Sequence, residues 1–176
     1  MIREDFMRYH NITSSDILNG DDLGVVLWVA GCNHKCKGCQ NPCTWNPDGG
    51  LEFDEGAEKE FLEEVAKDYH KRVTFSGGDP MHPNNVSKVL ELAKKIRKSY
   101  PDKKIWLYTG STLYDLFKLG GEYYELARLV DILVDGEYVE ELRDTNLPWV
   151  GSSNQNVIDM QKTKESGKLE IYNSIK

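Results

Sequence analysis

Apolar runs and helical patterns alternate along this chain from residue 54 onward. Short runs that are rich in β-branched or aromatic residues predict strands, which lie near 24–30, 73–75, 104–109 and 130–134. Between these runs, apolar residues recur at intervals of three and four, as they do on the buried face of a helix. Alternating strands and helices are the sequence signature of βαβ units, which build a parallel sheet. We therefore predict an α/β fold with a mostly parallel sheet.

Two apolar stripes predict the longest helices. Asp54 is suited to cap the first helix, whose inner face would consist of Ala57, Phe61, Leu62 and Val65. The inner face of the second helix would consist of Val86, Val89, Leu90, Ala93 and Ile96. Since both stripes are apolar at helical spacing, we expect them to pack in the core.

Weaker patterns predict the remaining elements. Shorter helices fit 112–119 and 121–129, a turn or short helix fits 137–142, and a further strand fits either 147–150 or 156–159. The two ends of the chain, 1–23 and 160–176, are polar and lack a clear period, although 12–18 fits an edge strand. With 176 residues, we expect one domain over 1–176, in which 1–23 is an extension or edge strand and 160–176 is a frayed tail.

Three polar motifs follow three successive predicted strands. A cysteine loop follows 24–30, Ser76-Gly77-Gly78-Asp79 follows 73–75, and Thr109-Gly110 ends the run at 104–109. Parallel strands joined by right-handed crossovers end at one edge of the sheet, and ligands bind outside those carboxyl ends. The three motifs are therefore expected on the same rim.

Net charge and the lengths of the apolar runs indicate which classes of partner and which cellular compartment to expect. The formal net charge is −7, from 22 basic and 29 acidic residues, and this disfavours nucleic acid because phosphate binding depends on clustered Lys and Arg. No apolar run reaches about 18 residues, and the first residues lack the basic head and apolar core of a secretion signal. We expect a cytosolic, cytoplasmic protein with no nucleic-acid partner and no membrane partner.

Three of the four cysteines lie together in the spacing C-x3-C-x2-C, at Cys32, Cys36 and Cys39. Three cysteines so close together are poorly placed for a disulfide framework. In a reducing compartment they are better suited to bind a metal ion or an iron–sulfur cluster. Three thiolates suit a [4Fe-4S] cluster with one open iron, whereas a cluster used for electron transfer normally has four cysteine ligands. The spacing therefore suggests a reactive cluster.

Two other kinds of site stay open on the residues alone. A fourth thiolate from Cys43 would close the cluster and make the protein an electron carrier, although Pro42 stiffens the chain before Cys43 and favours a free cysteine. Structural zinc bound by the three cysteines with Cys43 or His34 is the other alternative. Neither alternative accounts for the glycine motif on the same rim.

The cysteine spacing, followed by Gly77-Gly78-Asp79-Pro80, resembles the paired motifs of the radical S-adenosylmethionine (radical SAM) enzymes. The other matching segments are Ile17-Leu18-Asn19-Gly20, the run from Cys36 to Pro42, Thr44-Trp45, Tyr108-Thr109-Gly110 and the run from Trp149 to Gln155. Together they resemble the activating proteins of anaerobic ribonucleoside-triphosphate reductase, over about residues 9–160. Two positions depart from the radical SAM pattern. Gly38 stands where an aromatic residue is common, and Asp79 stands where glutamate is usual.

This resemblance implies a truncated partial (βα) barrel of the radical SAM type that binds a [4Fe-4S] cluster and S-adenosyl-L-methionine (SAM). It implies that Cys32, Cys36 and Cys39 ligate the cluster and that the cofactors, with no catalytic side chain, carry the chemistry. The implied cofactor-binding residues are Gly38, Gln40, Ser76, Gly77, Gly78, Asp79 and Thr109.

The implied activity is that of a glycyl-radical activase. One electron from an external donor, such as a flavodoxin, would cleave SAM to methionine and a 5′-deoxyadenosyl radical. That radical would then take a hydrogen atom from a glycine of the reductase large subunit, the protein substrate. Activation of another glycyl-radical enzyme, and a radical SAM reaction on a small substrate, are alternatives in the same class.

The cysteine loop also carries cations. Lys35, Lys37 and His34 are expected either to supply positive potential that lowers the pKa values of the thiols or to be plain solvated residues.

Other polar residues have weaker interpretations. His82 is a candidate to face the site, whereas His10 and His70 fit surface or hydrogen-bonded structural positions. Asp135 and the pair Asn154-Gln155 fit strand-end or capping roles better than ligand roles.

Overall fold

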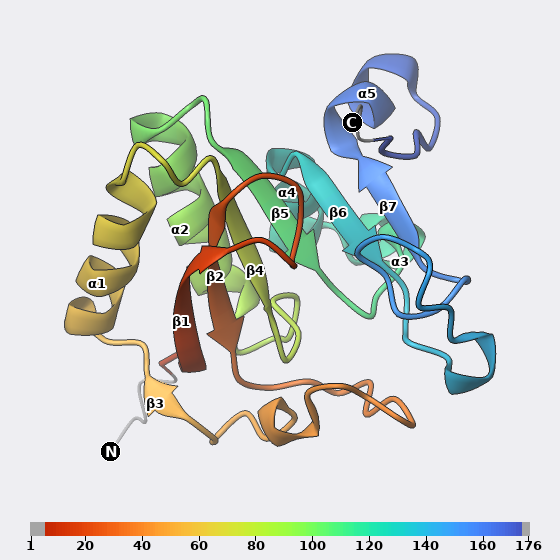
Figure 1. The fold of residues 1–176 in the computed structure, drawn as a ribbon, viewed down its shortest axis with the longest axis horizontal. Coiled ribbons are helices and arrows are strands. Elements are labelled where there is room, and N and C mark those ends of the chain that lie inside the picture. The colour runs from red at the N-terminus through yellow and green to blue at the C-terminus, as the bar shows by residue number, and fades with distance from the viewer. Residues whose placement is uncertain (1–5, 174–176) are drawn as a thin grey trace.

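The computed structural model describes residues 6–173 and is built around one seven-stranded sheet (Figure 1). The strands are β1 (Arg8–Asp16), β2 (Gly24–Val29), β3 (Leu51–Glu52), β4 (Arg72–Gly77), β5 (Lys104–Tyr108), β6 (Ile132–Asp135) and β7 (Asn156–Asp159). Their order across the sheet is β3-β1-β2-β4-β5-β6-β7. The four central strands, β2, β4, β5 and β6, are parallel, and β1, β3 and β7 pair antiparallel at the sides. The predicted α/β class and mostly parallel sheet are confirmed.

Helices follow the central strands, as the alternation predicted. They are α1 (Glu55–Ala66), α2 (Val86–Ser99), α3 (Leu113–Leu119), α4 (Gly121–Leu129) and α5 (Met160–Ser166), with short 3-10 helices η1 (Pro42–Thr44) and η2 (Glu140–Leu142). Asp54 caps α1 by accepting from the Ala57 N–H at 2.9 Å, which leaves one fewer unsatisfied donor at the helix start. Thr112 and Asp115 form a reciprocal capping box at the start of α3. The predicted helix at 137–142 is the shorter η2.

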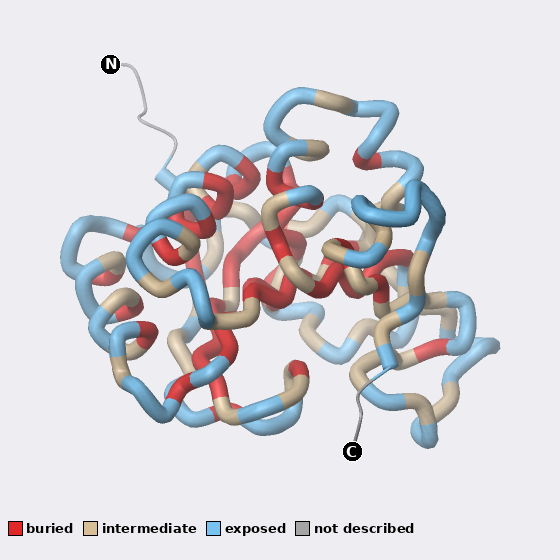
Figure 2. The backbone as a smooth tube through the Cα atoms, turned by 90° about the horizontal axis from the view of Figure 1, so that it is seen from above, coloured by how far each residue is buried: buried red, intermediate tan, exposed pale blue. Residues whose placement is uncertain are grey.

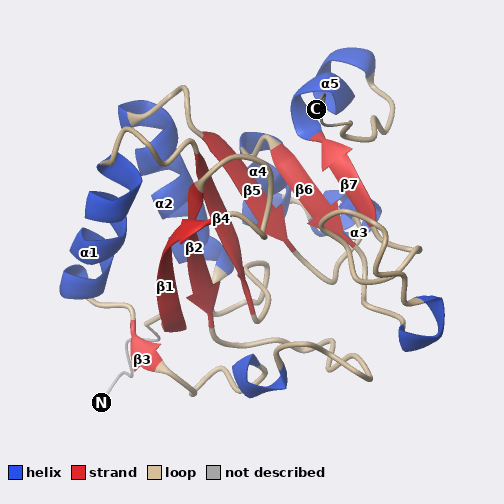
Figure 3. Ribbon diagram, viewed as in Figure 1, coloured by secondary structure: helices blue, strands red, loops and turns tan. Residues whose placement is uncertain are grey.

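The main core lies between the sheet and helices α1, α2 and α4. In Figure 3, α2 and α4 lie behind the strands and α1 lies beside them at the left. Both predicted apolar stripes face this core, with Phe61 and Ile96 fully buried and Leu62 partly buried. In Figure 2 the buried residues follow the central strands and the inward sides of the helices. Packing on one face of the sheet therefore leaves its other face and its rim for other contacts.

The opposite face of the sheet is covered by the loop before β2 and by the C-terminal segment. Arg72 is fully buried there and donates to Asp16 Oδ1 at 2.8 Å and to the carbonyl oxygen of Asp21 at 2.8 Å. Tyr172 donates its hydroxyl to the Asp21 carboxylate, which also accepts from Lys104 Nζ at 2.7 Å. These contacts close the end of the sheet at which β2, β4 and β5 begin.

Three sequence-based expectations differ from the structure. The predicted edge strand at 12–18 has different bounds, because β1 runs from Arg8 to Asp16. β3 pairs only with Arg8 and Tyr9, so the rest of β1 does lie at the edge of the sheet. No strand forms at 147–150, and the alternative at 156–159 is β7. The C-terminal segment is ordered through residue 173, because α5 buries Met160 and Ile171 bridges to Ile158. No helix among the described residues is long and apolar enough to cross a membrane.

Candidate functional site

The loops after β2, β4, β5 and β6 meet at the carboxyl ends of these strands. In Figure 1 the loop that carries the cysteines runs below these strand ends, from β2 toward the loop that follows β6. This is the shared rim that the order of strands and motifs predicted. The rim brings together chain segments that are separated by up to about a hundred residues.

Backbone hydrogen bonds join the glycine motif to the cysteine loop. The Gly78 N–H donates to Val29 O at 2.8 Å and the Asp79 N–H donates to Gly31 O at 2.7 Å. A Cβ atom on Gly78 would lie 2.5 Å from Gly31 O, and Gly77, at φ +105°, has backbone atoms of Val29 at 2.8 Å from its Cβ position. Both glycines are therefore required by the close approach of two backbones.

Each of the three clustered cysteines is half-buried and has a backbone N–H group beside its sulfur. His34 and Lys35 direct N–H groups at Cys32, Tyr138 directs one at Cys36, and the Asn41 N–H donates to Cys39 Sγ at 3.4 Å. Such donors stabilise anionic sulfur. The arrangement fits thiolate ligands of an iron–sulfur cluster.

The expected lowering of thiol pKa values by nearby cations is wrong for two of the cysteines. Burial raises the pKa of Cys32, and nearby Asp79 adds to that rise. Burial also raises the pKa of Cys36, helped by Glu137. Two cations of this loop face carboxylates instead, since Lys37 lies 3.2 Å from Glu140 and His34 contacts Asp79 and Glu137. In the protein without a cluster, these thiols are held protonated by burial and by acidic neighbours.

Asp79 is buried and bonded on both carboxylate oxygens. Its Oδ1 accepts from the Met81 N–H at 2.8 Å. Its Oδ2 lies 2.9 Å from His34 Nε2 and accepts from Thr109 Oγ1 at 3.1 Å and from the Gly110 N–H at 3.3 Å. The side chain thus connects the ends of β4 and β5 with the cysteine loop, and its hydrogen-bonding capacity is used within the protein.

His34 joins the cysteine loop to two other strand ends. Its Nε2 atom contacts Asp79, and its Nδ1 atom lies 2.6 Å from Glu137 Oε1. The hydrogen bond to Asp79, reinforced by that to Glu137 and opposed by burial, raises the pKa of His34 to about 9, so the ring is a cation at neutral pH. Gly110 is packed so closely on the ring that a Cβ atom would lie 2.5 Å from it. Local sequence patterns missed this role, because the contacts cross 45 and 103 residues of sequence.

A layer of chain from 136 to 155 covers the outer side of the cysteine loop. Glu140 and Tyr138 lie against Gly38, which has φ +73° and no space for a side chain. Gly151 is near Tyr138 and exposed Gln40. The run from Trp149 to Gln155, noted in the sequence only as a resemblance, therefore belongs to the surroundings of the cysteine loop.

Side chains in this layer have structural partners. Gln155 Oε1 accepts from the Gly151 N–H at 2.9 Å, and Asn154 Nδ2 donates to Glu137 O at 2.8 Å. Buried Asp135 accepts from the Leu113 N–H at 2.8 Å and from Asn156 Nδ2 at 2.9 Å. Their predicted structural roles are confirmed.

Of the remaining histidines, His82 lies beside the cysteine loop, whereas His70 lies away from it and His10 lies on β1. His82 is buried beside the cysteine loop, with Nε2 3.3 Å from Asn33 Oδ1, and burial lowers its pKa. His70 is buried and bonded to Ser15 and Glu64 O, as expected for a structural residue. The expectation for His10 is wrong, because it is half-buried and its Nε2 atom has no hydrogen-bond partner among the described residues.

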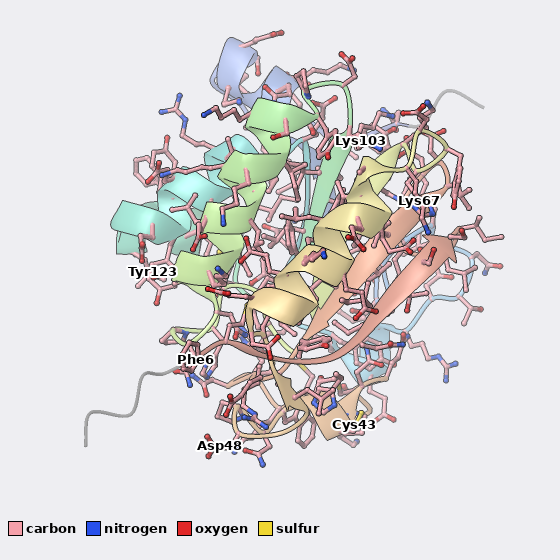
Figure 4. The ribbon with its side chains drawn as sticks, turned by 90° about the vertical axis from the view of Figure 1, so that its left-hand side faces the viewer. Phe6, Cys43, Asp48, Lys67, Lys103 and Tyr123 are labelled. Atoms are coloured by element: carbon pink, nitrogen blue, oxygen red, sulfur yellow. The ribbon has the colours of Figure 1, made fainter. Side chains whose placement is uncertain are left out.

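Cys43 is exposed in η1 and lies beyond the other cysteines on the loop. Figure 4 shows it near Asp48, at the end of the molecule opposite Lys67 and Lys103 and therefore on the rim side. Within residues 6–173, no three His, Cys, Asp or Glu side chains converge on a single-ion site.

Comparison with known proteins decides the family. A family model described as a 4Fe-4S single cluster domain matches residues 18–158. The anaerobic ribonucleoside-triphosphate reductase-activating protein of Escherichia coli (strain K12) is 40% identical over 151 residues, which cover 85% of this chain and 96% of that protein. The chain belongs to this family of activating proteins. The predicted [4Fe-4S] cofactor and the sequence-based resemblance are thereby confirmed.

Other members of the activating-protein family align over a similar length. The protein of Vibrio cholerae serotype O1 is 40% identical over 151 residues, covering 85% of this chain and 96% of that protein. The protein of Enterobacteria phage T4 is 38% identical over 149 residues, covering 85% of this chain and 92% of that protein. The match to the family model, over residues 18–158, includes the whole rim, from the cysteine loop to the layer that covers it.

Proposed function

We propose that the protein is a radical SAM activase whose protein substrate is the large subunit of anaerobic ribonucleoside-triphosphate reductase. Cys32, Cys36 and Cys39 would ligate the [4Fe-4S] cluster and leave one iron for SAM. Cluster and SAM, when bound, supply a one-electron cleavage to methionine and a 5′-deoxyadenosyl radical, which takes a hydrogen atom from a glycine Cα and leaves 5′-deoxyadenosine and a glycyl radical. An external one-electron donor of the flavodoxin type provides the electron.

The chain's own residues hold and orient these groups. Backbone N–H groups beside the three sulfurs stabilise thiolate ligands, and His34 fixes the cysteine loop against Asp79 and Glu137. The half-buried positions of the three cysteines limit the access of water to their sulfur atoms. No side chain is required to transfer a proton in the proposed reaction.

The proposed SAM contacts come mainly from backbone. Gly38, Gln40, Ser76, Gly77 and Gly78 are the residues assigned to present polar groups to SAM. Asp79 and Thr109 complete the assigned set, and their mutual hydrogen bond of 3.1 Å supports a role in which they hold the glycine motif in place. A buried carboxylate with four partners orients its neighbours more readily than it binds a further cation.

The architecture supports the finer fold assignment. Four parallel strands with helices on one face and polar motifs at their carboxyl ends are expected of a truncated (βα) barrel of the radical SAM type, in a single domain. A cluster held by thiolates also fits a reducing compartment, and we place the protein in the cytoplasm.

The observation that carries the proposal is the direct backbone pairing of the cysteine loop with the glycine motif, through Gly78 to Val29 and Asp79 to Gly31. A zinc site or an electron carrier needs no such second motif. In the proposed enzyme the cysteine loop would hold the cluster and the glycine motif would hold SAM, so the pairing of the two segments would serve both.

The test is anaerobic reconstitution with iron and sulfide, followed by a strong reductant and SAM. We expect 5′-deoxyadenosine from the wild type and none from Cys36→Ala. Cys43→Ala is the matched control, since it removes an exposed thiol from the same loop and should keep both cluster and activity. An intact cluster that yields no 5′-deoxyadenosine, and that is lost in Cys43→Ala, would favour the electron carrier.

Adding the reductase large subunit tests the substrate. Electron paramagnetic resonance should then show an organic radical on the reductase, and deuterium at its glycine Cα should appear in 5′-deoxyadenosine. SAM cleavage without either signal would retain the radical chemistry but assign it to another substrate.

A further inference from the structure

An apolar groove lies between α3, α4 and α5, away from the cysteine loop. Its volume is about 450 Å³, and its floor and walls include Leu113, Tyr114, Phe117, Tyr124 and Met160. Phe117 and Tyr114 are 61% and 64% exposed, and Leu169 at the groove's other side is 51% exposed. Clustered large apolar side chains at a surface of this kind mark an interaction site, because their exposure to water is unfavourable.

Basic side chains surround this groove. Arg128 lies over the Tyr124 ring at 5.5 Å, Lys118 lies over the Tyr114 ring at 4.4 Å, and Lys164 and Lys168 line the opposite side. Within residues 6–173, none of these four cations has a carboxylate oxygen within 4.0 Å, although neighbouring Arg97 and Lys162 do. Lys164 Nζ donates to the Arg128 carbonyl oxygen at 2.9 Å instead. Four neighbouring cations without a close carboxylate stand out in a chain whose formal net charge is −7.

Several nearby carboxylates have closer partners than these cations, although Asp115 still acts on Lys118 at longer range and Asp131 and Glu165 act on Lys164. Glu125 pairs with Lys94 at 2.6 Å, and Glu122 accepts from Ser87 Oγ at 2.6 Å. Asp115 is bonded in the capping box of α3. A ligand that contributes negative charge would therefore be attracted by the cations around the groove, and burial of the apolar floor would add to the affinity.

The charge pattern distinguishes between possible occupants. A symmetric contact with a second copy would place the same patch on itself, which would bring four cations against four cations. An amphipathic helix with apolar residues on one face and Asp or Glu beside them matches both the apolar floor of the groove and the cations around it. Such a helix in a groove between helices is a common mode of peptide recognition.

We infer that the groove between α3, α4 and α5 is a docking surface for an acidic amphipathic helix of the reductase that this protein activates. This inference rests on the proposed function. The groove adjoins the site through α3, whose cap Thr112 follows Thr109-Gly110 on the rim by two residues. A partner that presents a glycine loop to the rim could thus also occupy the groove, and the second contact would raise the affinity without touching SAM.

The test compares two pairs of variants for binding to the purified reductase large subunit under anaerobic conditions. Phe117→Ser should weaken binding about tenfold or more, whereas Tyr69→Ser, which removes an aromatic side chain that is 54% exposed elsewhere, should not. Lys118→Glu with Lys168→Glu should also weaken binding about tenfold at low salt, and added salt should reduce that difference. Lys71→Glu with Lys98→Glu makes the same change of charge at other exposed positions and is the matched control.

Reductase-independent formation of 5′-deoxyadenosine separates this inference from the proposed function. The groove variants should retain it, because none of them touches the cysteine loop or the glycine motif. Wild-type protein that forms no 5′-deoxyadenosine would refute the proposed function, whereas active variants that bind the reductase like wild type would refute only the groove. A groove variant that converts a dimer to a monomer would assign the surface to a second copy, and one that loses binding to vesicles of anionic lipid would assign it to a membrane. Either result would overturn the inference.

Discussion

Replacing Gly78 with alanine is expected to separate the glycine motif from the cysteine loop. The new Cβ atom would lie 2.5 Å from Gly31 O and 2.9 Å from Thr44 O. Because carbon atoms in contact normally lie about 3.5 Å or more from their neighbours, the two backbones must move apart by roughly 1 Å. Both neighbours are backbone atoms, so no side-chain rotation can relieve the contact.

The magnitude follows from the hydrogen bonds that this movement breaks. The Gly78–Val29 and Asp79–Gly31 bonds, at 2.8 and 2.7 Å, contribute about 1 kcal/mol each, and residual overpacking adds about 1 kcal/mol. A total of about 2–3 kcal/mol would lower the melting temperature of a chain of this size by roughly 4–12 °C.

The assay is thermal unfolding of the cluster-free protein, followed by measurement of iron and sulfide after reconstitution. Gly56→Ala is the matched control, because Gly56 is an exposed residue of α1 whose Cβ position meets only Asp54 Oδ1, at 3.2 Å. It should unfold at or above the wild-type temperature, since alanine favours a helix. If Gly78→Ala unfolded within about 1 °C of wild type and bound a full cluster, the close backbone approach would not hold the two motifs together.

Three further outcomes are expected. Asp16→Asn, which leaves the buried Arg72 guanidinium without its counter-ion, should reduce the free energy of unfolding in urea by about 2–3 kcal/mol; an unchanged value would contradict the burial of that pair. His34→Ala should open the cysteine loop and speed alkylation of Cys32 and Cys36 in the cluster-free protein about 30-fold or more, if two charge-assisted hydrogen bonds contribute about 2–3 kcal/mol together. Burial lowers the pKa of His82 in the folded state, so the stability that its neutral ring contributes is present above its ordinary pKa of 6.5 and is lost as the pH falls through the folded value. In urea unfolding, His82→Gln should therefore lose less free energy of unfolding than wild type between pH 7 and pH 5. An equal loss would assign the pH dependence to other groups.

Local patterns were sufficient for the parts of the fold that depend on short-range physics. The apolar runs of β2, β4, β5 and β6 and the capping residue Asp54 are each specified within a few residues. The common rim of the three motifs also followed, because parallel strands must end at one edge. By contrast, the start of β1 at Arg8 was missed, because the local pattern does not show that its first residues pair with β3 on their outer side.

The surroundings of the cysteines could not be read in the same way. His34 looked like one of several loop cations, whereas its two carboxylate partners come from the ends of β4 and β6. Burial raises the pKa values of Cys32 and Cys36, and the carboxylates of Asp79 and Glu137 add to the rise, so both values move in the opposite direction to the expected one. The surroundings of the cysteines depend on charged residues that are far apart in the sequence, such as His34 and Glu137, and no short window of sequence contains both members of such a pair.

The contact between Tyr172 and Asp21 has a consequence for the order of folding. These residues are separated by 151 positions, so the end of the sheet where they meet can close only when almost the whole described chain has been synthesised. Closing so long a loop is entropically costly and late. The β2–β4–β5 units, with the loop that Arg72 binds through Asp16, Asn19 and Asp21, can form earlier during translation. In such an intermediate the pairing of the cysteine loop with the glycine motif can already be made, whereas the contact of Tyr172 with that loop is still missing.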